Sequence, residues 1–373
     1  MDALALPLNW QRVRLGDIGK PCMCKRVMKH QTTRYGEIPF YKIGTFGNTA
    51  DAFISKKLFL EYKTKYSFPK KGDILISASG TIGRAVIYDG KPAYFQDSNI
   101  VWIDNDETLV KNDFLFYAYS NVKWNTEHTT ILRLYNDNFR NTLIPLPPLN
   151  EQIAIANILS DLDRYLYALR ALILKKEGVK KALSFELLSQ RKRLKGFNQA
   201  WQRVRLGDIA NYLTSNLSVE QITQQGKIKV YDVNNFIGYT DTTFISDKPY
   251  ISIVKDGSVG RVRILPPKTN ILSTMGALIA NHRTTTEFLF YLLSNFDFKN
   301  FTSGSIIPHI YFKDYKEKTI FLPPLNEQIA IANILSALDN EIASLKNKKR
   351  QFENIKKALN HDLMSAKIRV LEK

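Results

Sequence analysis

Cysteine is scarce in this sequence of 373 residues, which contains only Cys22 and Cys24. Two cysteines are too few for a disulfide framework and are typical of a protein kept in a reducing cytosol. His30 follows nearby, but no second cysteine pair completes the usual ligand set of a zinc site. We therefore expect both cysteines to be reduced thiols in a loop.

Long apolar runs are also missing. No run approaches the length of about 18 residues that a membrane-spanning helix needs. The first residues, Met1–Trp10, lack the basic and then apolar layout of a signal peptide. We expect a cytoplasmic protein, and 44% hydrophobic residues is an ordinary content for a soluble chain of two or three domains.

The common catalytic and nucleotide-binding motifs do not occur. The sequence has no G-x-G-x-x-G, no G-x-x-x-x-G-K-[ST] and no Asn/Asp-Pro-Pro-aromatic tetrad of an adenine methyltransferase. Methyl transfer to a flipped base needs such a pocket. We therefore expect no catalytic residue, no cofactor and no metal ligand. The rival hypothesis is an enzyme with a cryptic active site, which activity of the isolated chain would support.

Acidic residues are fewer than basic residues in this sequence. Lys and Arg total 53 and Asp and Glu total 35, which gives a formal net charge of +18. A balance this basic favours a polyanionic partner, most commonly nucleic acid. Composition alone does not distinguish DNA from RNA or from an anionic membrane surface.

Two strings are repeated exactly along the chain. WQRVRLGDI occurs at Trp10–Ile18 and again at Trp201–Ile209, an offset of 191 residues. LPPLNEQIAIANILS occurs at Leu146–Ser160 and again at Leu322–Ser336, an offset of 176 residues. Internal repeats indicate a duplicated architecture. The chain therefore consists of two copies of one unit, each a variable block followed by a nearly identical block.

Weaker matches lie between these strings. Gly80–Arg84 matches Gly257–Arg261 at an offset of 177, and Phe114–Tyr117 matches Phe288–Tyr291 at an offset of 174. Most of the length difference between the copies therefore falls in the first part of the variable block. A constant block joined to a divergent one suits a protein with one shared attachment surface and two different targets.

The repeated block predicts a long helix. Pro147 and Pro148 end the preceding segment, Asn150 is a good N-cap, and Glu151 suits the positive end of the helix dipole. Apolar residues then recur at steps of four and three, as in a coiled coil: Ile155, Leu159, Leu162, Leu166, Leu169 and Ile173, and in the second copy Ile331, Leu335, Leu338, Ile342 and Leu345. Each helix could run for about 40 residues, or about 60 Å. The pair most simply packs antiparallel, with the variable domains at opposite ends.

The variable blocks read as mixed α+β. β-rich runs flank the tight turn at Gly80–Arg84, and short aromatic helices follow. The predicted fold class is therefore α+β, with two globular domains separated by an antiparallel coiled coil and related by an internal twofold pseudo-repeat. The expected boundaries are 1–147 and 196–323 for the variable domains, and 148–195 and 324–373 for the two helical segments.

These motifs resemble those of the specificity (S) subunit of type I restriction–modification systems. The signature is Leu-Pro-Pro-Leu-Asn-Glu-Gln-Ile at Leu146–Ile153 and at Leu322–Ile329, with Lys-Gly-Phe-Asn at the junction Lys195–Asn198. The resemblance implies that each variable block is a target recognition domain reading one half of a split double-stranded DNA site. It also implies that the helices set the gap and dock two methyltransferase (M) subunits. Restriction (R) subunits would join for ATP-driven cleavage, and adenine methylation would also belong to the partners.

The candidate DNA-binding residues fall in three regions of each copy. The first copy has a basic loop with Lys25, Arg26, Lys29 and Arg34, where the second has polar residues that include Ser215 and Asn216. Arg84 and Arg261 end the two glycine turns, whose glycines we expect to supply positive φ rather than to bind. The segment before each Pro-Pro contributes Arg133 in the first copy and Ser303, Ser305 and His309 in the second.

The candidate partner-binding residues are the helix starts, Asn150, Glu151, Gln152, Asn326, Glu327 and Gln328. Capping explains the Asn and the Glu, but a repeated docking surface also explains why fifteen residues are identical. Recent duplication or gene conversion is the alternative. Charge reversal at Glu151 and Glu327 is predicted to weaken methyltransferase binding. A non-catalytic scaffold or RNA adaptor outside restriction–modification remains the rival function.

Overall fold

The computed structural model describes residues 7, 9–128 and 132–370 and divides the chain into two compact units. Unit 1 contains residues 1–169 and 348–373, and unit 2 contains residues 170–347. Two helices, α5 (Leu149–Leu188) and α8 (Leu325–Met364), each pass from one unit into the other, and each has 40 residues as predicted. None of the helices in the described residues is long and apolar enough to cross a membrane.

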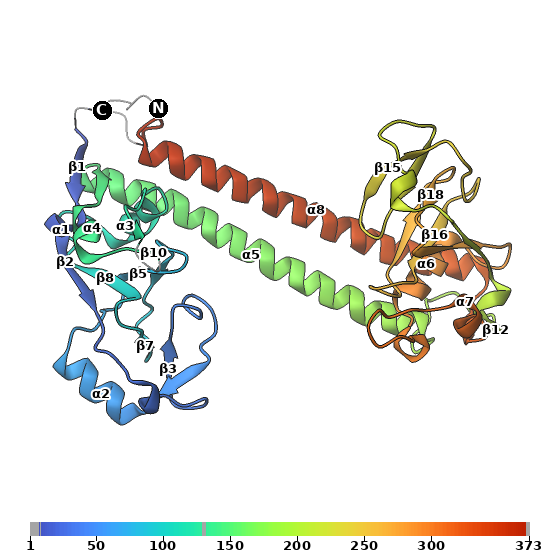
Figure 1. Cartoon of the computed structure of the whole chain (residues 1–373), viewed down its shortest axis with the longest axis horizontal. Helices are drawn as coiled ribbons and strands as arrows, with labels where there is room; N and C mark the ends of the chain where they lie inside the picture. The colour runs from blue at the N-terminus through green and yellow to red at the C-terminus, as the bar shows by residue number, and fades with distance from the viewer. Residues whose placement is uncertain (1–6, 8, 129–131, 371–373) are drawn as a thin grey trace. The chain divides into compact units, whose positions relative to one another are not determined.

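Unit 1 is built around a four-stranded sheet in the order β2-β8-β5-β6 and a three-stranded sheet in the order β4-β3-β7 (Figure 1). A two-stranded ribbon pairs β1 with β11, and another pairs β10 with β9. Before α5 the elements are β1 (Gln11–Arg14), α1 (Leu15–Ile18), β2 (Gly19–Met23), η1 (Lys29–Gln31), β3 (Ile38–Tyr41), β4 (Ala52–Ile54), α2 (Lys56–Lys65), β5 (Ile74–Ser77), β6 (Ala85–Ile87), β7 (Tyr94–Phe95), β8 (Ile100–Asn105), α3 (Asn112–Tyr119), β9 (Glu127–His128), β10 (Leu132–Arg133), α4 (Asn136–Asn141) and β11 (Leu143–Leu146).

Unit 2 repeats this arrangement with sheets in the orders β13-β19-β16-β17 and β15-β14-β18, and with a ribbon of β12 and β20. Between α5 and α8 the elements are β12 (Gln202–Arg205), η2 (Leu206–Asp208), β13 (Ala210–Thr214), η3 (Val219–Gln221), β14 (Ile228–Tyr231), β15 (Phe236–Thr240), β16 (Tyr250–Val254), β17 (Val262–Leu265), β18 (Asn270–Ile271), β19 (Met275–Ala280), α6 (Thr286–Ser294), η4 (Lys299–Phe301), α7 (Phe312–Tyr315) and β20 (Thr319–Leu322). The α+β class and the internal repeat predicted from the sequence are therefore confirmed.

The length difference between the copies has a structural explanation. Helix α2 follows β4 in unit 1, and the fully described unit 2 has no helix between β15 and β16. The loop between β3 and β4 is also longer than the loop between β14 and β15. Ser55 caps α2 by accepting a hydrogen bond from Leu58 N. The extra residues thus lie in α2 and in the longer loop before β4, and Phe59 of α2 is buried in the same core cluster as Ile38 and Leu75.

The central strands of the larger sheets are buried on both faces, as an apolar run predicts. All residues of β5 and of β16 are buried. Helices α3 and α6 cover these sheets with buried aromatic and aliphatic side chains, among them Phe114 and Phe288. The predicted core helices and strands therefore form, and they leave the turns between β5 and β6 and between β16 and β17 at the surface.

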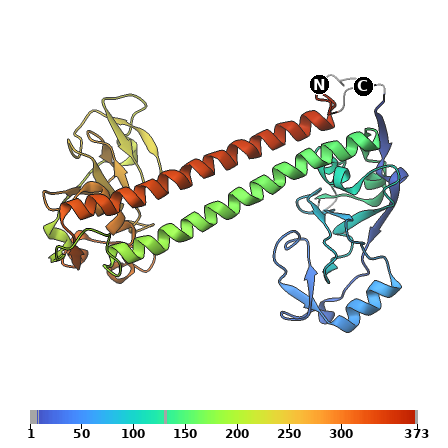
Figure 2. The same cartoon turned by 180° about the vertical axis from the view of Figure 1, so that it is seen from behind.

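Within each unit α5 and α8 lie side by side and run antiparallel, which Figures 1 and 2 both show. In unit 1, Tyr165 packs on Phe352 with ring centroids 4.7 Å apart. In unit 2, the Nζ of Lys176 lies 2.8 Å from a carboxylate oxygen of Glu341, and the Nζ of Lys180 lies 2.5 Å from Asp339. Lysines that interrupt the apolar stripe therefore bind carboxylates of the opposite helix.

A tyrosine joins each variable block to the helix pair at the same place in both units. The hydroxyl of Tyr117 donates to Asp163 over 2.9 Å, and that of Tyr291 donates to Asp339 over 2.9 Å. Burial, and then the hydrogen bond to Asp339, raises the pKa of Tyr291 above its ordinary value. The tyrosine therefore stays a neutral donor at physiological pH.

A buried glutamate in the first turn of each long helix accepts hydrogen bonds from residues that are distant in the sequence of its unit. The carboxylate of Glu151 accepts from the indole Nε1 of Trp10 over 3.0 Å and from the guanidinium of Arg369 over 2.7 Å and 3.0 Å. In unit 2 the carboxylate of Glu327 accepts from Trp201 over 2.9 Å and from Arg193. Both carboxylates are buried, so each charge depends on its donors.

Two details of the sequence interpretation change. Helix α5 begins at Leu149, and the carbonyl of Pro148 accepts its first hydrogen bond, from Gln152 N over 2.9 Å. Asn150 therefore lies inside the first turn and is not the N-cap. Cys22 lies in strand β2 rather than in a loop, and Cys24 directly follows that strand. Burial raises the pKa of the Cys24 thiol to about 12.

The buried glutamate predicts a large asymmetry between two carboxylate deletions in unit 2. Glu327→Ala leaves the Trp201 indole and the Arg193 guanidinium without their acceptor and should lower the free energy of unfolding by about 3 kcal/mol. Glu341→Ala removes only a half-exposed ion pair and should cost less than about 1 kcal/mol. Urea unfolding followed by far-ultraviolet circular dichroism measures both, and equal shifts would contradict a structural role for Glu327.

Candidate nucleic-acid interface

The glycine turn and the segment before Pro-Pro lie next to each other in unit 1. Ser79, directly before the turn Gly80–Arg84, forms a β-bridge with Arg133, and Leu134 N donates to Ala78 O over 2.8 Å. These two segments are more than 40 residues apart in the sequence, and the fold of unit 1 joins them. The first-copy segment that contributes Arg133 spans Glu127–Arg133, and its residues 129–131 lie outside the described residues.

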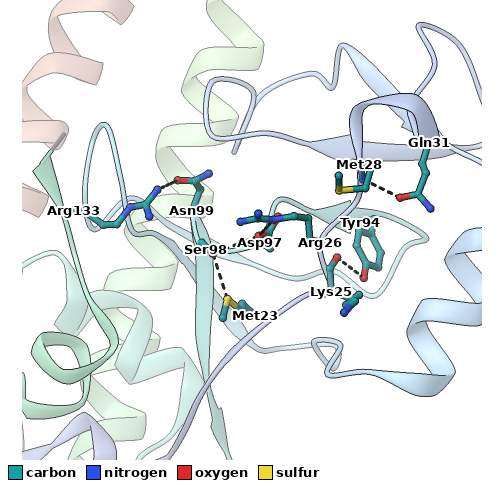
Figure 3. Close-up of polar contacts among 10 residues, drawn as sticks. All are labelled: Met23, Lys25, Arg26, Met28, Gln31, Tyr94, Asp97, Ser98, Asn99 and Arg133. Carbon is teal, nitrogen blue, oxygen red and sulfur yellow. Dashed lines mark hydrogen bonds and ion pairs between the residues drawn. The ribbon is translucent and has the colours of Figure 1, made fainter. Parts of the chain in front are cut away.

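The loop between β7 and β8 connects this pair of segments to the basic loop (Figure 3). Asn99 Oδ1 accepts from Ser79 Oγ over 2.7 Å and from Arg133 Nη2 over 3.3 Å. Two residues earlier, Asp97 accepts from Arg26 Nε over 2.8 Å. Ser98, between them, has a φ of +59°, a conformation that costs energy for a residue other than glycine. The short segment from Asp97 to Asn99 thus fixes Arg26 and Arg133 on one surface.

The basic loop itself is exposed. Lys25, Arg26, Lys29 and Arg34 all reach solvent. Lys25 Nζ lies 5.1 Å from the centre of the Tyr66 ring, and Lys25 O accepts from the Tyr94 hydroxyl over 3.1 Å. The loop backbone is therefore anchored to the core at Lys25. Lys25, Lys29 and Arg34 present exposed cations, while Arg26 pairs with Asp97. Exposed cations of this kind can contact phosphates.

Arg84 is exposed, and part of its guanidinium is hydrogen-bonded within unit 1. Its Nη1 donates to Phe46 O over 2.9 Å, so one edge of the guanidinium is held by the loop that follows β3. The remaining N–H groups can bind an anion. Arg261, which ends the corresponding turn of unit 2, is also exposed.

The glycines of the turns have the structural role expected from the sequence. Gly80, Gly83, Gly257 and Gly260 all have φ between +63° and +83°. A Cβ on Gly83 would collide with the Trp124 indole, and one on Gly260 would lie 2.6 Å from the Phe298 ring. Glycine is therefore required both by the backbone conformation and by the close approach of an aromatic ring.

Unit 2 joins the same two segments with different side chains. Asp256, directly before the turn, forms a β-bridge with His309, and Gly257 N donates to Pro308 O over 2.9 Å. His309 Nδ1 lies 2.7 Å from Asp256 Oδ1. Because a carboxylate is an acceptor, Nδ1 donates, and Nε2 is the ring atom left to meet a base edge.

The other candidates of unit 2 differ in exposure. Ser303 and Ser305 are exposed on the segment that precedes His309, where Gly304 has a φ of +88°. Asn216 is also exposed. Ser215 is buried, and its hydroxyl accepts from Leu217 N over 3.2 Å. The structure therefore gives Ser215 a role in its own turn, because a side chain without access to solvent does not reach a base.

The structure also shows residues that the sequence interpretation missed. Asn99 and Asp256 each hold the predicted reading residue of their unit, Arg133 or His309. Asp256 corresponds by offset to Ser79, so a comparison of the copies does not reveal it. Only the fold places these polar side chains together: a β-bridge joins Asp256 to His309, and Asn99 accepts from both Ser79 and Arg133 at the bridge of unit 1.

The helix starts divide into an inward and an outward face. Glu151, Gln152, Glu327 and Gln328 are buried. Gln152 Oε1 accepts from Lys111 N over 2.9 Å, and Gln328 Oε1 accepts from Thr285 N over 3.1 Å. Internal hydrogen bonds thus account for these four residues, which were predicted to bind a partner. Partner contact stays a prediction for Asn150 and Asn326, which are exposed.

One protein family matches this chain twice, once in each copy of the repeat. The family described as "Type I restriction modification DNA specificity domain" matches residues 7–176 and again residues 198–354. A putative type I restriction enzyme specificity subunit of Haemophilus influenzae is 62% identical over 152 residues, which is 40% of this chain and 40% of that protein. The chain therefore matches less than half the length of that relative.

Other relatives match along most of their length. The type I restriction enzyme MjaVIII specificity subunit of Methanocaldococcus jannaschii is 26% identical over 414 residues, covering 99% of this chain and 95% of that protein. The crystal structure of a type I restriction–modification S subunit from M. genitalium has the same fold, with a TM-score of 0.64, 20% identity and coverage of 97% and 98% of the two chains. Because the family matches most of the sequence in two successive copies, this chain belongs to the type I restriction–modification DNA specificity family.

Proposed function

We propose that this chain reads a two-part DNA site, with one half of the site bound by each unit. The observation that carries the proposal is the repeated junction of two loops. Ser79 and Arg133 meet in unit 1, and Asp256 and His309 meet at the same place in unit 2. The backbone bridge is the same in both units, but the side chains at the bridge differ. Two units with the same backbone arrangement and different side chains suit a DNA site whose two halves differ in sequence.

The surface chemistry supports a DNA partner. Exposed cations border the junction in unit 1, and the net charge of the chain is +18. Phosphate contacts position a protein on duplex DNA, while side chains at base edges specify the sequence. Arginine pairs well with guanine and histidine can bind purine edges, so Arg133 and His309 are the proposed reading residues.

The remaining parts of the proposal follow from the family. The recognition domains are residues 1–147 and 196–323, and α5 and α8 set the gap between the half-sites. The chain is non-catalytic and acts in the cytoplasm with two methyltransferase subunits, which methylate adenine, and with restriction subunits, which cleave DNA with ATP. The alternative is a scaffold or RNA adaptor, which preferential binding to structured RNA would support.

Substitution of one proposed reading residue at a time tests whether each unit reads its own half-site. We expect the chain, co-expressed with its methyltransferase subunit, to produce N6-methyladenine in a split motif with a constant gap. Arg133→Ala should relax base choice only in one half, at a cost of about 1–3 kcal/mol, because one bidentate contact is lost. His309→Ala should relax base choice only in the other half. Single-molecule sequencing of methylated DNA measures all three motifs.

The control for this experiment is Tyr167→Phe, which changes a largely exposed side chain of α5. It should leave the motif unchanged. Relaxation of both halves by either reading variant would contradict the assignment of one half-site to each unit. Stable complexes without any methylated motif would contradict the proposed reading function itself.

We place the methyltransferase docking on the outward face of the repeated block. Leu149, Ile153, Leu325 and Ile329 are between 40% and 48% exposed, although all four are large and apolar. The same residues recur at the same positions of both helices. Repeated exposed apolar side chains are a common basis of protein interfaces. Charge reversal at Glu151 or Glu327 would instead break a buried cluster, so it does not test docking.

The docking face predicts how many methyltransferase subunits bind when it is altered. Ile153→Asp should reduce the number of bound methyltransferase subunits from two to one, and so should Ile329→Asp, because each removes one apolar anchor by burying a charge. The double variant should bind none. Native mass spectrometry counts the subunits. Ile355→Asp, at another half-exposed position of α8, is the control and should still bind two. Two bound subunits in the double variant would contradict this docking face.

A further inference from the structure

A basic cleft lies within unit 1, between the end of α3 and the last part of α8. It has a volume of about 810 Å³. The residues on which the argument depends are Gly83, Arg84, Lys123, Glu353, Lys356 and Lys357. Four of these six side chains carry a positive charge and one carries a negative charge. The recognition block contributes one wall and the helix contributes the other.

Three of the four cations in this cleft are not neutralised by a carboxylate. Lys356 Nζ lies 2.5 Å from Asp163 and 5.4 Å from the centre of the Tyr117 ring, so its charge is used inside the unit. Lys123 and Lys357 are exposed and form no ion pair with any described residue. Arg84 makes a hydrogen bond to a neutral carbonyl and keeps its charge. The one lining carboxylate, Glu353, pairs with Lys349 over 2.6 Å.

Unit 2 has a much less basic cleft at the same place. Its volume is about 360 Å³. Lys180 and Lys346 there pair with Asp339 and Glu177 over 2.5 Å and 2.6 Å. Lys181, the counterpart of Lys357, is the lining lysine without an ion pair among the described residues. If the cationic residues served only to pack the helices, both clefts would carry the same charge. The excess of positive charge in the cleft of unit 1 therefore needs another explanation.

The loop after α3 shows the clearest difference between the copies. Trp124 packs against Gly83 in unit 1, and Phe298 packs against Gly260 in unit 2. The residue before each of these aromatic side chains is Lys123 in unit 1 and aspartate in unit 2. The positive charge that this loop carries in unit 1, where Lys123 lines the cleft, is therefore replaced by a negative charge in the loop of unit 2, while the contact of the aromatic ring with the turn is kept.

The cleft is continuous with the surface proposed to read DNA. Arg84 lines the cleft and also ends the turn Gly80–Arg84. The other end of the same turn adjoins Ser79, which bridges to Arg133. The proposed reading residue and the basic cleft thus lie at the two ends of one five-residue turn. A duplex bound at Arg133 would bring backbone phosphates close to the cleft.

We propose that this cleft binds a backbone phosphate of the DNA next to the half-site read by unit 1. Lys123 and Lys357 supply ammonium groups from opposite walls, and Arg84 supplies a guanidinium whose planar N–H groups match phosphate oxygens. The contact is independent of sequence and is made partly by helix α8, outside the recognition block. This inference rests on the proposed function, because it assumes that unit 1 binds duplex DNA.

The test measures the salt dependence of DNA affinity for the complex with methyltransferase subunits. Each phosphate contact contributes about 0.9 to the slope of log affinity against log salt concentration. We expect the double variant Lys123→Ala, Lys357→Ala to lower the magnitude of the slope by about 0.9, the contribution of one phosphate. Affinity should fall by the same factor for cognate and non-cognate duplexes, with their ratio unchanged. Lys181→Ala, the matched change in unit 2, should lower the slope by much less.

Several outcomes would overturn the inference. An unchanged slope in the double variant, or an equal decrease in Lys181→Ala, would remove the phosphate from this cleft. Thermal stabilisation by inorganic phosphate that the double variant loses, with an unchanged DNA slope, would assign the cleft to a free anion instead. Absence of any duplex binding by the unaltered complex would overturn the proposed function as well. Circular dichroism confirms that the variants fold, and Lys123→Gln with Lys357→Gln provides a second, less disruptive pair.

Discussion

The buried carboxylate in the first turn of each long helix is the interaction on which both units depend. Glu151 and Glu327 each accept hydrogen bonds from an indole and a guanidinium that lie more than 100 residues away in the sequence. A buried carboxylate without donors costs several kcal/mol. The unit is therefore stable only when the tryptophan before its first strand and the arginine after the opposite helix are both bonded to the carboxylate. This requirement accounts for the glutamate that both helix starts keep.

Around this fixed frame the structure leaves a small number of positions open to change. The glycine turns need positive φ and a closely packed aromatic ring, and both copies keep these features. The residues at the ends of the turns are not constrained in this way. Ser79 and Asp256 occupy the same place, and so do Arg133 and His309. The side chains at these positions can therefore differ between the copies, because a backbone bridge fixes the position of each segment. A hydrogen bond to Asn99 or Asp256 then orients Arg133 or His309.

Electrostatics distinguishes the copies more than their folds do. In unit 2 the lysines beside α6 are mostly neutralised by carboxylates of the long helices. In unit 1 the corresponding region has unpaired cations, and the loop before β3 adds more. Charges of this kind do not determine the fold, but they attract a polyanion and set the salt dependence of its binding. We therefore propose that unit 1 attracts DNA more strongly than unit 2 does.

The sequence by itself determined the duplication, the two 40-residue helices and the α+β class, because repeats and heptad spacing are local patterns that survive without tertiary information. It also predicted the glycine turns, since glycine, which lacks a Cβ, adopts positive φ more readily than other residues. Only the tertiary structure decided which candidates meet. Burial turned Glu151, Gln152 and Ser215 inward. A side-chain hydrogen bond brought Asn99 to Arg133, and a β-bridge brought Asp256 to His309. Burial and pairing across more than 30 residues depend on how strands register in a sheet, and no single stretch of sequence encodes that.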